Sequence, residues 1–257
     1  MRTLLFALLV SSAASGDEIQ IAAAASLQDA LRVITLNYQR SSNDRVLFNF
    51  AGSNVLALQI RAGAPVDVFL AADEETMNSV VALVSARRPL LSNTLVVVSN
   101  IPLRNARELL RARRIALGDP NAVPAGVYAR QYLQRIGLWR DLLPKIIPME
   151  NVRAALASVD GGNVDAAIVY KTDAMLARRA RVAFEIDGPD APHIVYPVAI
   201  VRSSRHPAAA RRFFGYLTSP EAAAVFRRFG FVTLPPTRPA SSRSVGTTSR
   251  PPVRPRS

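Results

Sequence analysis

One local pattern recurs three times in the first third of this 257-residue chain: a short apolar strand, a few small residues, and then the start of a helix. The strands are expected at residues 19–24, 46–50 and 66–70, and each runs into a segment whose apolar residues recur at helical spacing. Strands that alternate with helices through short connections favour parallel sheets with helices on their faces. The pattern therefore predicts an α/β fold.

Ser26 lies between the first of these strands and its helix. With Asp29 it has the Ser-x-x-Asp spacing of a capping box, which predicts that the serine side chain caps the helix. A helix that begins at a strand end also directs unpaired N–H groups and the positive end of its dipole into a crevice, and this geometry binds anions. Ser26 is therefore either a simple cap or part of an anion site. Asp73 follows the third strand, and the helix that it caps is expected to extend through Val84.

The same pattern continues in the second half of the chain. Strands are expected at residues 115–117, 145–148 and 166–170. Pro124 suits the first turn of a helix because its missing N–H would have been unpaired there, and Asn151 is expected to cap another helix. Further strands are expected at residues 94–98, 182–186 and 194–201, and two closing helices at residues 207–217 and 220–229.

The length suits either one large α/β domain or two lobes of about a hundred residues each. We expect each lobe to be a mostly parallel sheet flanked by helices, with a ligand cleft between the lobes, because ligands of such sheets bind beyond the carboxyl ends of strands. The expected organisation is a signal peptide at residues 1–16, lobe 1 at 17–98 plus 194–234, lobe 2 at 99–193, and a tail at 235–257.

The two ends of the chain have compositions of their own. Arg2, the apolar run at residues 4–10 and the small residues that follow are typical of a secretory signal peptide, with cleavage expected before Asp17. The protein is therefore expected in the periplasm. The tail after residue 234 is rich in proline, serine and arginine, which predicts disorder.

Several classes of site are disfavoured. The chain has no cysteine, and its two histidines, His193 and His206, stand thirteen residues apart beside prolines, so we expect no metal site. No Gly-x-Ser-x-Gly elbow and no phosphate loop is present, so we expect no catalytic residues and no enzyme. The formal net charge is +13, but six of the basic residues fall in the leader and tail. We take the remaining +7 as mild attraction for anions and expect no nucleic-acid partner.

Six motifs in order carry a family resemblance: AAAASLQDAL, NFAGSNVLALQI, GAPVDVFLAAD, LGDPNAVPAGVYA, ENVRAAL and AAIVYKTDA. Through them the chain resembles the periplasmic molybdate-binding proteins of bacterial ABC importers, from about residue 19 to residue 232. The resemblance implies a two-lobed type II periplasmic binding protein that needs no cofactor. It implies capture of molybdate, and of tungstate as well, as a monomer, with delivery to the membrane permease of an ABC importer.

The resemblance also implies which positions hold the oxyanion. Three would offer hydroxyl groups and three only backbone N–H groups; in chain order they are Ser26, Ser53, Ala72, Ala125, Val152 and Tyr170. Tyr170 could instead be a core residue whose hydroxyl bonds within the protein. Three other functions stay open: the same scaffold binding sulfate or another tetrahedral oxyanion, a regulatory sensor domain of similar fold, and a secreted α/β hydrolase.

Overall fold

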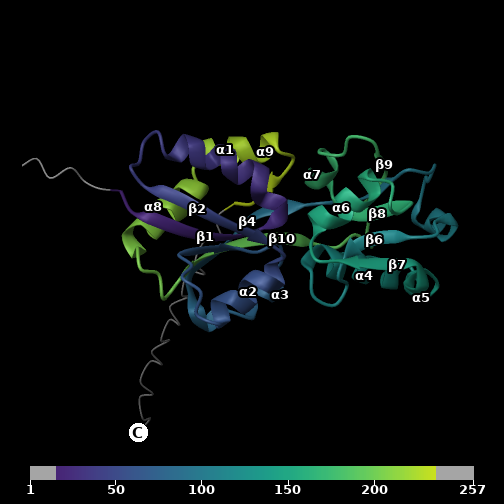
Figure 1. Ribbon diagram of the computed structural model, residues 1–257, viewed down its shortest axis with the longest axis horizontal. Coiled ribbons are helices and arrows are strands. Elements are labelled where there is room, and N and C mark those ends of the chain that lie inside the picture. The colour runs from purple at the N-terminus through teal and green to yellow at the C-terminus, as the bar shows by residue number, and fades with distance from the viewer. Residues whose placement is uncertain (1–15, 236–257) are drawn as a thin grey trace, which may run out of the picture.

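The computed structural model describes residues 16–235, which form two sheets lying side by side, each with its own helices (Figure 1). We call the six-stranded sheet and its helices lobe 1, and the five-stranded sheet and its helices lobe 2. The expected signal peptide, apart from Gly16, and the expected tail, apart from Pro235, lie outside the described residues.

Lobe 1 carries helices on both faces of its sheet. The strand order is β11-β4-β10-β3-β1-β2. The strands are β1 (Glu18–Ala24), β2 (Arg45–Ala51), β3 (Val68–Leu70), β4 (Val84–Asn93), β10 (Ile194–Val201) and β11 (Val232–Thr233). One face is covered by α1 (Gln28–Tyr38), α8 (Pro207–Leu217) and α9 (Pro220–Arg228), and the other by α2 (Ser53–Arg61) and α3 (Glu74–Asn78). The apolar residues on the two faces of this sheet belong to two separate clusters, and the cluster on the α1 side continues into lobe 2.

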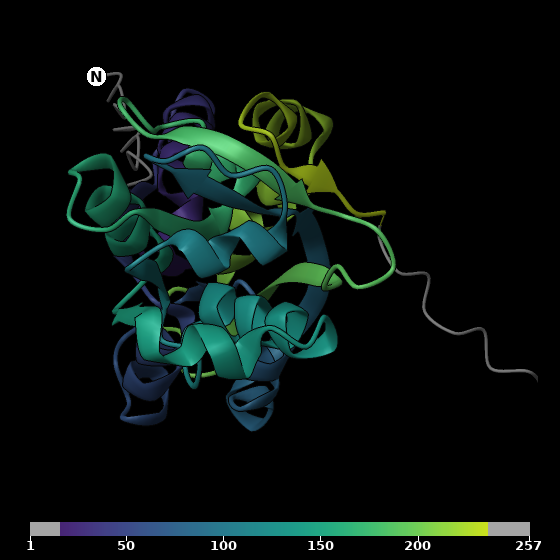
Figure 2. The same cartoon turned by 90° about the vertical axis from the view of Figure 1, so that its right-hand side faces the viewer.

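Lobe 2 repeats this arrangement with the strand order β7-β6-β8-β5-β9. Its strands are β5 (Leu95–Ser99), β6 (Ile115–Gly118), β7 (Ile146–Met149), β8 (Ala166–Tyr170) and β9 (Arg181–Ile186). Its helices are α4 (Pro124–Arg135), α5 (Trp139–Leu142), α6 (Val152–Asp160) and α7 (Lys171–Ala174), and Figure 2 views the molecule from this lobe. Short 3-10 turns complete the chain at η1 (Ala25–Leu27), η2 (Val81–Leu83), η3 (Ala106–Arg111) and η4 (Leu143–Lys145).

The two-lobed α/β architecture agrees with the sequence-based expectation, but the sheets are mixed rather than mostly parallel. Strand β1 pairs in parallel with β2 and β3, whereas β10 runs antiparallel to both β3 and β4. In lobe 2, β6 is parallel to β7 and β8, and β5 is antiparallel to β8 and β9. Strands β4 and β5 flank the first crossing between lobes, and β9 and β10 flank the second, so all four strands next to the crossings take part in antiparallel pairs.

Two local expectations were wrong. The segment after Asp73 does not stay helical to Val84: α3 ends at Asn78, and Val84 begins strand β4, which pairs along its length with β10. Strand β5, expected in lobe 1, pairs with β8 and β9 of lobe 2, so the chain changes sheets at Thr94 instead of after residue 98. In both cases pairing with a distant strand decides the outcome, and the local apolar pattern does not contain that information.

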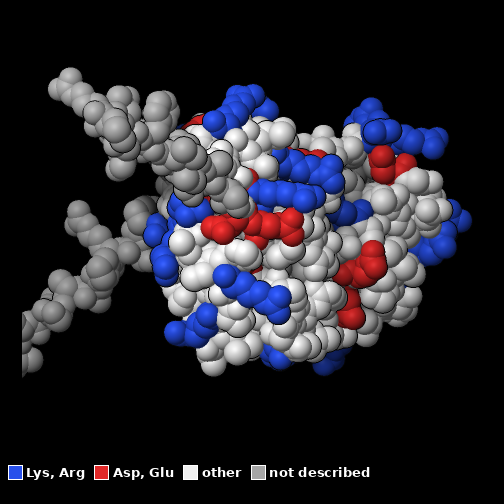
Figure 3. Space-filling model, turned by 60° about the vertical axis from the view of Figure 1, so that its left-hand side comes forward, with Lys and Arg blue, Asp and Glu red and all other residues white. Residues whose placement is uncertain are grey.

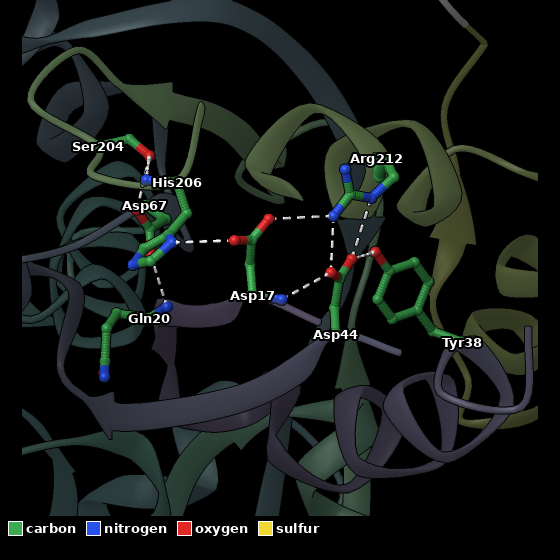
Figure 4. A network of polar contacts seen from close by, with 8 residues as sticks. All are labelled: Asp17, Gln20, Tyr38, Asp44, Asp67, Ser204, His206 and Arg212. Atoms are coloured by element: carbon green, nitrogen blue, oxygen red, sulfur yellow. Dashed lines mark hydrogen bonds and ion pairs between the residues drawn. The ribbon is translucent and has the colours of Figure 1, made fainter. Parts of the chain in front are cut away.

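A network of charged and polar groups fixes the start of β1 in lobe 1 (Figure 4). Arg212 on α8 holds the Asp44 carboxylate with both Nε and Nη2, at 3.1 and 2.6 Å, and reaches Asp17 at 3.3 Å. The Tyr38 hydroxyl donates to the same Asp44 carboxylate, and His206 lies 3.5 Å from Asp17. Helices α1 and α8 are thereby tied to the first residues of the sheet. On the face shown in Figure 3, basic and acidic side chains lie interspersed.

Candidate functional site

A cavity between the lobes has all six of the expected oxyanion-binding residues in its wall. Lobe 1 contributes Ser26, Ser53 and Ala72, which follow the carboxyl ends of β1, β2 and β3. Lobe 2 contributes the other three: Ala125 at the start of α4, Val152 at the start of α6, and Tyr170 at the end of β8. No carboxylate, histidine or lysine side chain lines it. That the six residues hold an anion is a prediction.

Ser26 does not cap helix α1, contrary to the capping-box expectation. It lies within the 3-10 turn η1, and Leu27, not Ser26, occupies the cap position of α1 without any side-chain hydrogen bond. The Ser26 hydroxyl instead lies 3.1 Å from the Tyr196 hydroxyl on β10. The inserted turn rotates Ser26 away from the helix N–H groups, so the simple cap interpretation is wrong and its hydroxyl lies at the cavity.

The Tyr196 hydroxyl belongs to a buried chain of hydrogen bonds that continues across the lobe crossing. Asn93, the last residue of β4, donates its side-chain amide to the Tyr196 hydroxyl at 3.3 Å and to the Thr172 hydroxyl at 2.9 Å. Thr172 is in α7 of lobe 2. A continuous polar path therefore joins Ser26 of lobe 1 to the segment of lobe 2 that directly follows Tyr170.

Ser53 and Ala72 are bonded to each other. The backbone N–H of Ala72 donates to the Ser53 hydroxyl oxygen at 3.0 Å, and both residues are buried. The Ala72 N–H is thus occupied in positioning Ser53, which differs from its expected role as a free donor. Because the Ser53 oxygen accepts this bond, its own O–H hydrogen is left to donate towards the cavity.

The other two backbone donors come from the first turns of helices. Ala125 is the second residue of α4, which begins at Pro124 as expected, and Val152 is the first residue of α6. N–H groups of a first helical turn have no acceptor within the helix. Asn151 caps α6 as expected, accepting from the Ala154 N–H at 3.0 Å, so the cap leaves the N–H groups of the two preceding residues free for another acceptor.

Tyr170 ends β8 and is only 1% exposed. Its hydroxyl makes no hydrogen bond of ordinary geometry among the described residues. The Tyr196 hydroxyl is near enough for Tyr170 to lower the pKa of Tyr196, but Tyr196 already bonds with Ser26 and Asn93. This arrangement argues against the alternative of a core tyrosine bonded within the protein. Burial raises the pKa of Tyr170 well above its ordinary value. Smaller contributions in the same direction come from the nearby hydroxyls of Tyr196 and Tyr128 and the carboxylates of Asp73 and Asp173. The hydroxyl is therefore protonated at neutral pH and is an unused donor facing the cavity.

A larger cleft of about 850 Å³ lies beside the cavity, between α2 and α3 of lobe 1 and α4 of lobe 2. Its wall includes Asp73, Glu74 and Glu75. Burial raises the pKa of Asp73. Arg61 and Arg130 line the same cleft, so its wall carries both acidic and basic side chains. The cleft lies between the same lobes as the smaller cavity, and Pro124 lines both.

Sequence reasoning missed the charged groups next to the site. Arg153 follows Val152, and its guanidinium reaches the Ser26 carbonyl oxygen at 3.4 Å and the Asp29 carboxylate at 2.8 Å. It also pairs with Asp173, which is fully buried in α7. The one available signal was an arginine within the apolar α6 motif, and nothing local showed which carboxylates it meets.

Two kinds of feature are absent from the described residues. No helix in residues 16–235 combines the length and apolarity needed to cross a membrane. The same part of the chain contains no cluster of three or more histidine and acidic side chains placed to hold a metal ion.

Comparison with known proteins places this geometry in a family. Residues 19–232 match the family model described as bacterial extracellular solute-binding protein. The chain is 38% identical to the molybdate-binding protein ModA of Escherichia coli over 86% of this chain and 91% of that protein. Two solved structures share the fold. The periplasmic molybdate-binding protein of Azotobacter vinelandii has a TM-score of 0.75 and 23% identity, and the match covers 84% of this chain and 99% of that chain. The sulfate-binding protein SubI of Mycobacterium tuberculosis has a TM-score of 0.74 and 17% identity, and the match covers 84% of this chain and 86% of that chain. On the extent of the family match, the chain belongs to the bacterial extracellular solute-binding proteins.

Proposed function

We propose that this protein captures molybdate, and also tungstate, in the cavity between its lobes. The observation that carries the proposal is the buried Tyr170 hydroxyl, which makes no hydrogen bond of ordinary geometry in the described protein and belongs to a residue that lines the same cavity as Ser26 and Ser53. A buried donor without an acceptor costs about 1–3 kcal/mol, and a bound oxyanion would remove that cost.

The character of the cavity wall supports a doubly charged oxyanion. Hydroxyl and backbone N–H donors surround the space, and its wall contains no carboxylate that could accept a hydrogen bond from a ligand. Hydrogen phosphate has the same charge but carries an O–H group for which the described wall offers no carboxylate acceptor, and an unmet buried donor costs about 1–3 kcal/mol. Helix starts at α4 and α6 supply partial positive charge to a dianion.

The 38% identity to a protein named as molybdate-binding supports molybdate as the ligand. This is a binding function and not a catalytic one, in keeping with a family of solute-binding proteins. We further propose that the protein works in the periplasm after removal of residues 1–16, as a monomer, and that it delivers its ligand to the membrane permease of an ABC importer. The family description as extracellular supports export of the chain.

A thermal-shift and calorimetry panel on residues 17–257 tests the proposal. Molybdate and tungstate are expected to raise the melting temperature strongly, whereas sulfate and phosphate at equal concentration raise it little. At a ligand concentration about 1,000 times the dissociation constant, binding adds roughly 4 kcal/mol of stability. No stabilisation by any of the four anions would overturn the proposal.

Sulfate is the second candidate because a sulfate-binding protein fits the fold as well as a molybdate-binding one does, with TM-scores of 0.74 and 0.75. Sulfate has the charge and shape of molybdate but is smaller, so selection between them depends on how closely the lobes approach. Equal stabilisation by sulfate and molybdate in the panel would replace the molybdate assignment with a general dianion carrier.

A further inference from the structure

Arg153 spans the gap between the lobes. It is the second residue of α6 in lobe 2, and its Nη2 atom lies 2.8 Å from the Asp29 carboxylate and 3.4 Å from the Ser26 carbonyl oxygen, both in lobe 1. On the other side its Nε atom pairs with the Asp173 carboxylate of lobe 2. The arginine therefore holds one carboxylate from each lobe.

Among residues 16–235, the Arg153–Asp29 contact is the one ion pair that joins the two lobes. Each of the other ion pairs in these residues joins two side chains of the same lobe. Examples are Arg45–Glu18 and Arg212–Asp44 in lobe 1, and Arg113–Asp165 and Lys171–Glu185 in lobe 2. The lobes also approach closely on another side, since a methyl group added at Gly52 would lie 3.0 Å from the Glu150 carbonyl oxygen. The structure is thus a closed arrangement in which the cross-lobe pair is made.

The two partners of Arg153 differ in what happens when the lobes separate. Asp173 is 0% exposed and belongs to the same lobe, so it stays beside the guanidinium whatever the lobes do. The Asp29 side chain is 36% exposed and belongs to the other lobe, so its contact is lost when the cleft opens. Asp173 therefore preorganises the guanidinium, and Asp29 is the partner gained on closure.

The residues flanking this pair are those that line the cavity. Arg153 directly follows Val152, and Asp29 lies one helical turn after Ser26, whose carbonyl oxygen Arg153 also reaches. Without the arginine, Asp29 would be an unpaired negative charge close to a site for a dianion. The pair thus neutralises that charge at the moment the cleft closes.

We propose that Arg153 and Asp29 form a cross-lobe latch that slows release of the bound oxyanion, with Asp173 as the positioning residue that holds the guanidinium ready in lobe 2. This inference rests on the proposed oxyanion-binding function. Arg153 acts by stabilising the closed state, so its main effect falls on the dissociation rate and not on the association rate.

The decisive variant is Asp29→Asn, with molybdate as the probe and association and dissociation rates measured by stopped-flow protein fluorescence. A latch predicts about three- to tenfold faster dissociation, an association rate within a factor of two, and an unchanged melting temperature without ligand. If Asp29 acts only as a negative charge near the site, removing it would tighten binding, which is the opposite sign. The matched control is Glu18→Gln, which removes a half-exposed ion pair within lobe 1 and should leave both rates unchanged.

A double-variant background completes the test. Arg153→Gln combined with Asp173→Asn removes the lobe 2 side of the latch without leaving a buried carboxylate unpaired. In that background, Asp29→Asn should no longer accelerate dissociation. If the wild-type protein binds molybdate but Asp29→Asn leaves the dissociation rate unchanged or lowers it, the latch proposal is wrong and the proposed function stands. Wild-type protein that fails to bind molybdate would overturn both the latch and the proposed function.

Discussion

The hydroxyl oxygens of Ser26 and Tyr196 lie 3.1 Å apart, and this buried contact joins a residue of the cavity wall to strand β10, 170 positions later in the chain. Tyr196 also accepts from the Asn93 amide at the point where the chain leaves lobe 1. The orientation of the Ser26 hydroxyl is therefore set by a strand next to the lobe crossing and not by the helix that follows it.

Tyr196→Phe is expected to weaken molybdate binding about two- to tenfold, because Ser26 would lose the group that orients its hydroxyl, and a net hydrogen bond contributes about 0.5–1.5 kcal/mol. Isothermal titration calorimetry measures the change. Tyr132→Phe, in α4 and outside the cavity wall, is the control and should bind normally. Normal affinity in Tyr196→Phe would show that Ser26 needs no orientation by β10.

Tyr170→Phe should weaken binding more strongly, by about ten- to 150-fold, since a hydrogen bond to a charged group contributes about 1.5–3 kcal/mol. The same change should leave the melting temperature without ligand unchanged or higher, because it removes a buried hydroxyl that lacks a partner. A lower melting temperature with affinity kept within a factor of two would identify Tyr170 as a structural residue.

Gly52→Val should weaken binding without unfolding the protein. The backbone of Gly52 is in an ordinary extended conformation (φ −60°, ψ 138°), so valine is not strained there. A side chain would nevertheless meet Asn54 of its own lobe and the Glu150 carbonyl oxygen of the other lobe, which opposes closure. Small-angle scattering with saturating molybdate should show a more open molecule than the wild type. Gly215→Ala, on a helix with open space around the added methyl group, should close normally.

Asp173→Asn should change how stability depends on pH. Burial raises the pKa of Asp173 to about 6, and the neighbouring Arg153 opposes this rise only in part. The folded protein then holds a proton that the unfolded chain, with a pKa near 3.8, has released, so this group lowers the free energy of unfolding as pH rises from about 4 to about 6. The loss is about 3 kcal/mol, and the variant should lack it. Parallel urea-unfolding profiles for wild type and variant between pH 4 and pH 7 would contradict the assignment.

Asp44 should show the opposite dependence. Burial works to raise the pKa of Asp44, but hydrogen bonds from Arg212, Tyr38 and Ser42 outweigh it and hold the pKa well below its usual range. Its stabilising effect is thus complete above about pH 4 and is lost as pH falls further. Asp44→Asn is expected to lower the free energy of unfolding at pH 7 by about 2–3 kcal/mol, because it leaves Arg212 without its main partner. The difference from wild type should shrink at pH 2–3, and a constant difference would be inconsistent with this account.

Features that depend on neighbours in the chain were determined by the sequence alone. The alternation of strands and helices, the Asp73 and Asn151 caps, and Pro124 in the first turn of α4 all occur where local patterns indicated. The six expected site positions also meet at one cavity, because strand ends and helix starts of an α/β sheet converge at the same edge.

Only the tertiary structure decided the features that depend on distant residues. Val84 begins β4 because it pairs with β10, although the sequence predicted that the helix after Asp73 would extend through it. The Ala72 N–H is taken by Ser53, 19 positions earlier, and Ser26 turns towards Tyr196 instead of capping α1. Arg153 meets Asp29 across 124 positions of sequence. The first three of these contacts arise when lobe 1 folds on itself, and the last arises when the two lobes meet. A contact between distant residues leaves no periodic pattern in either segment, so the sequence alone does not reveal it.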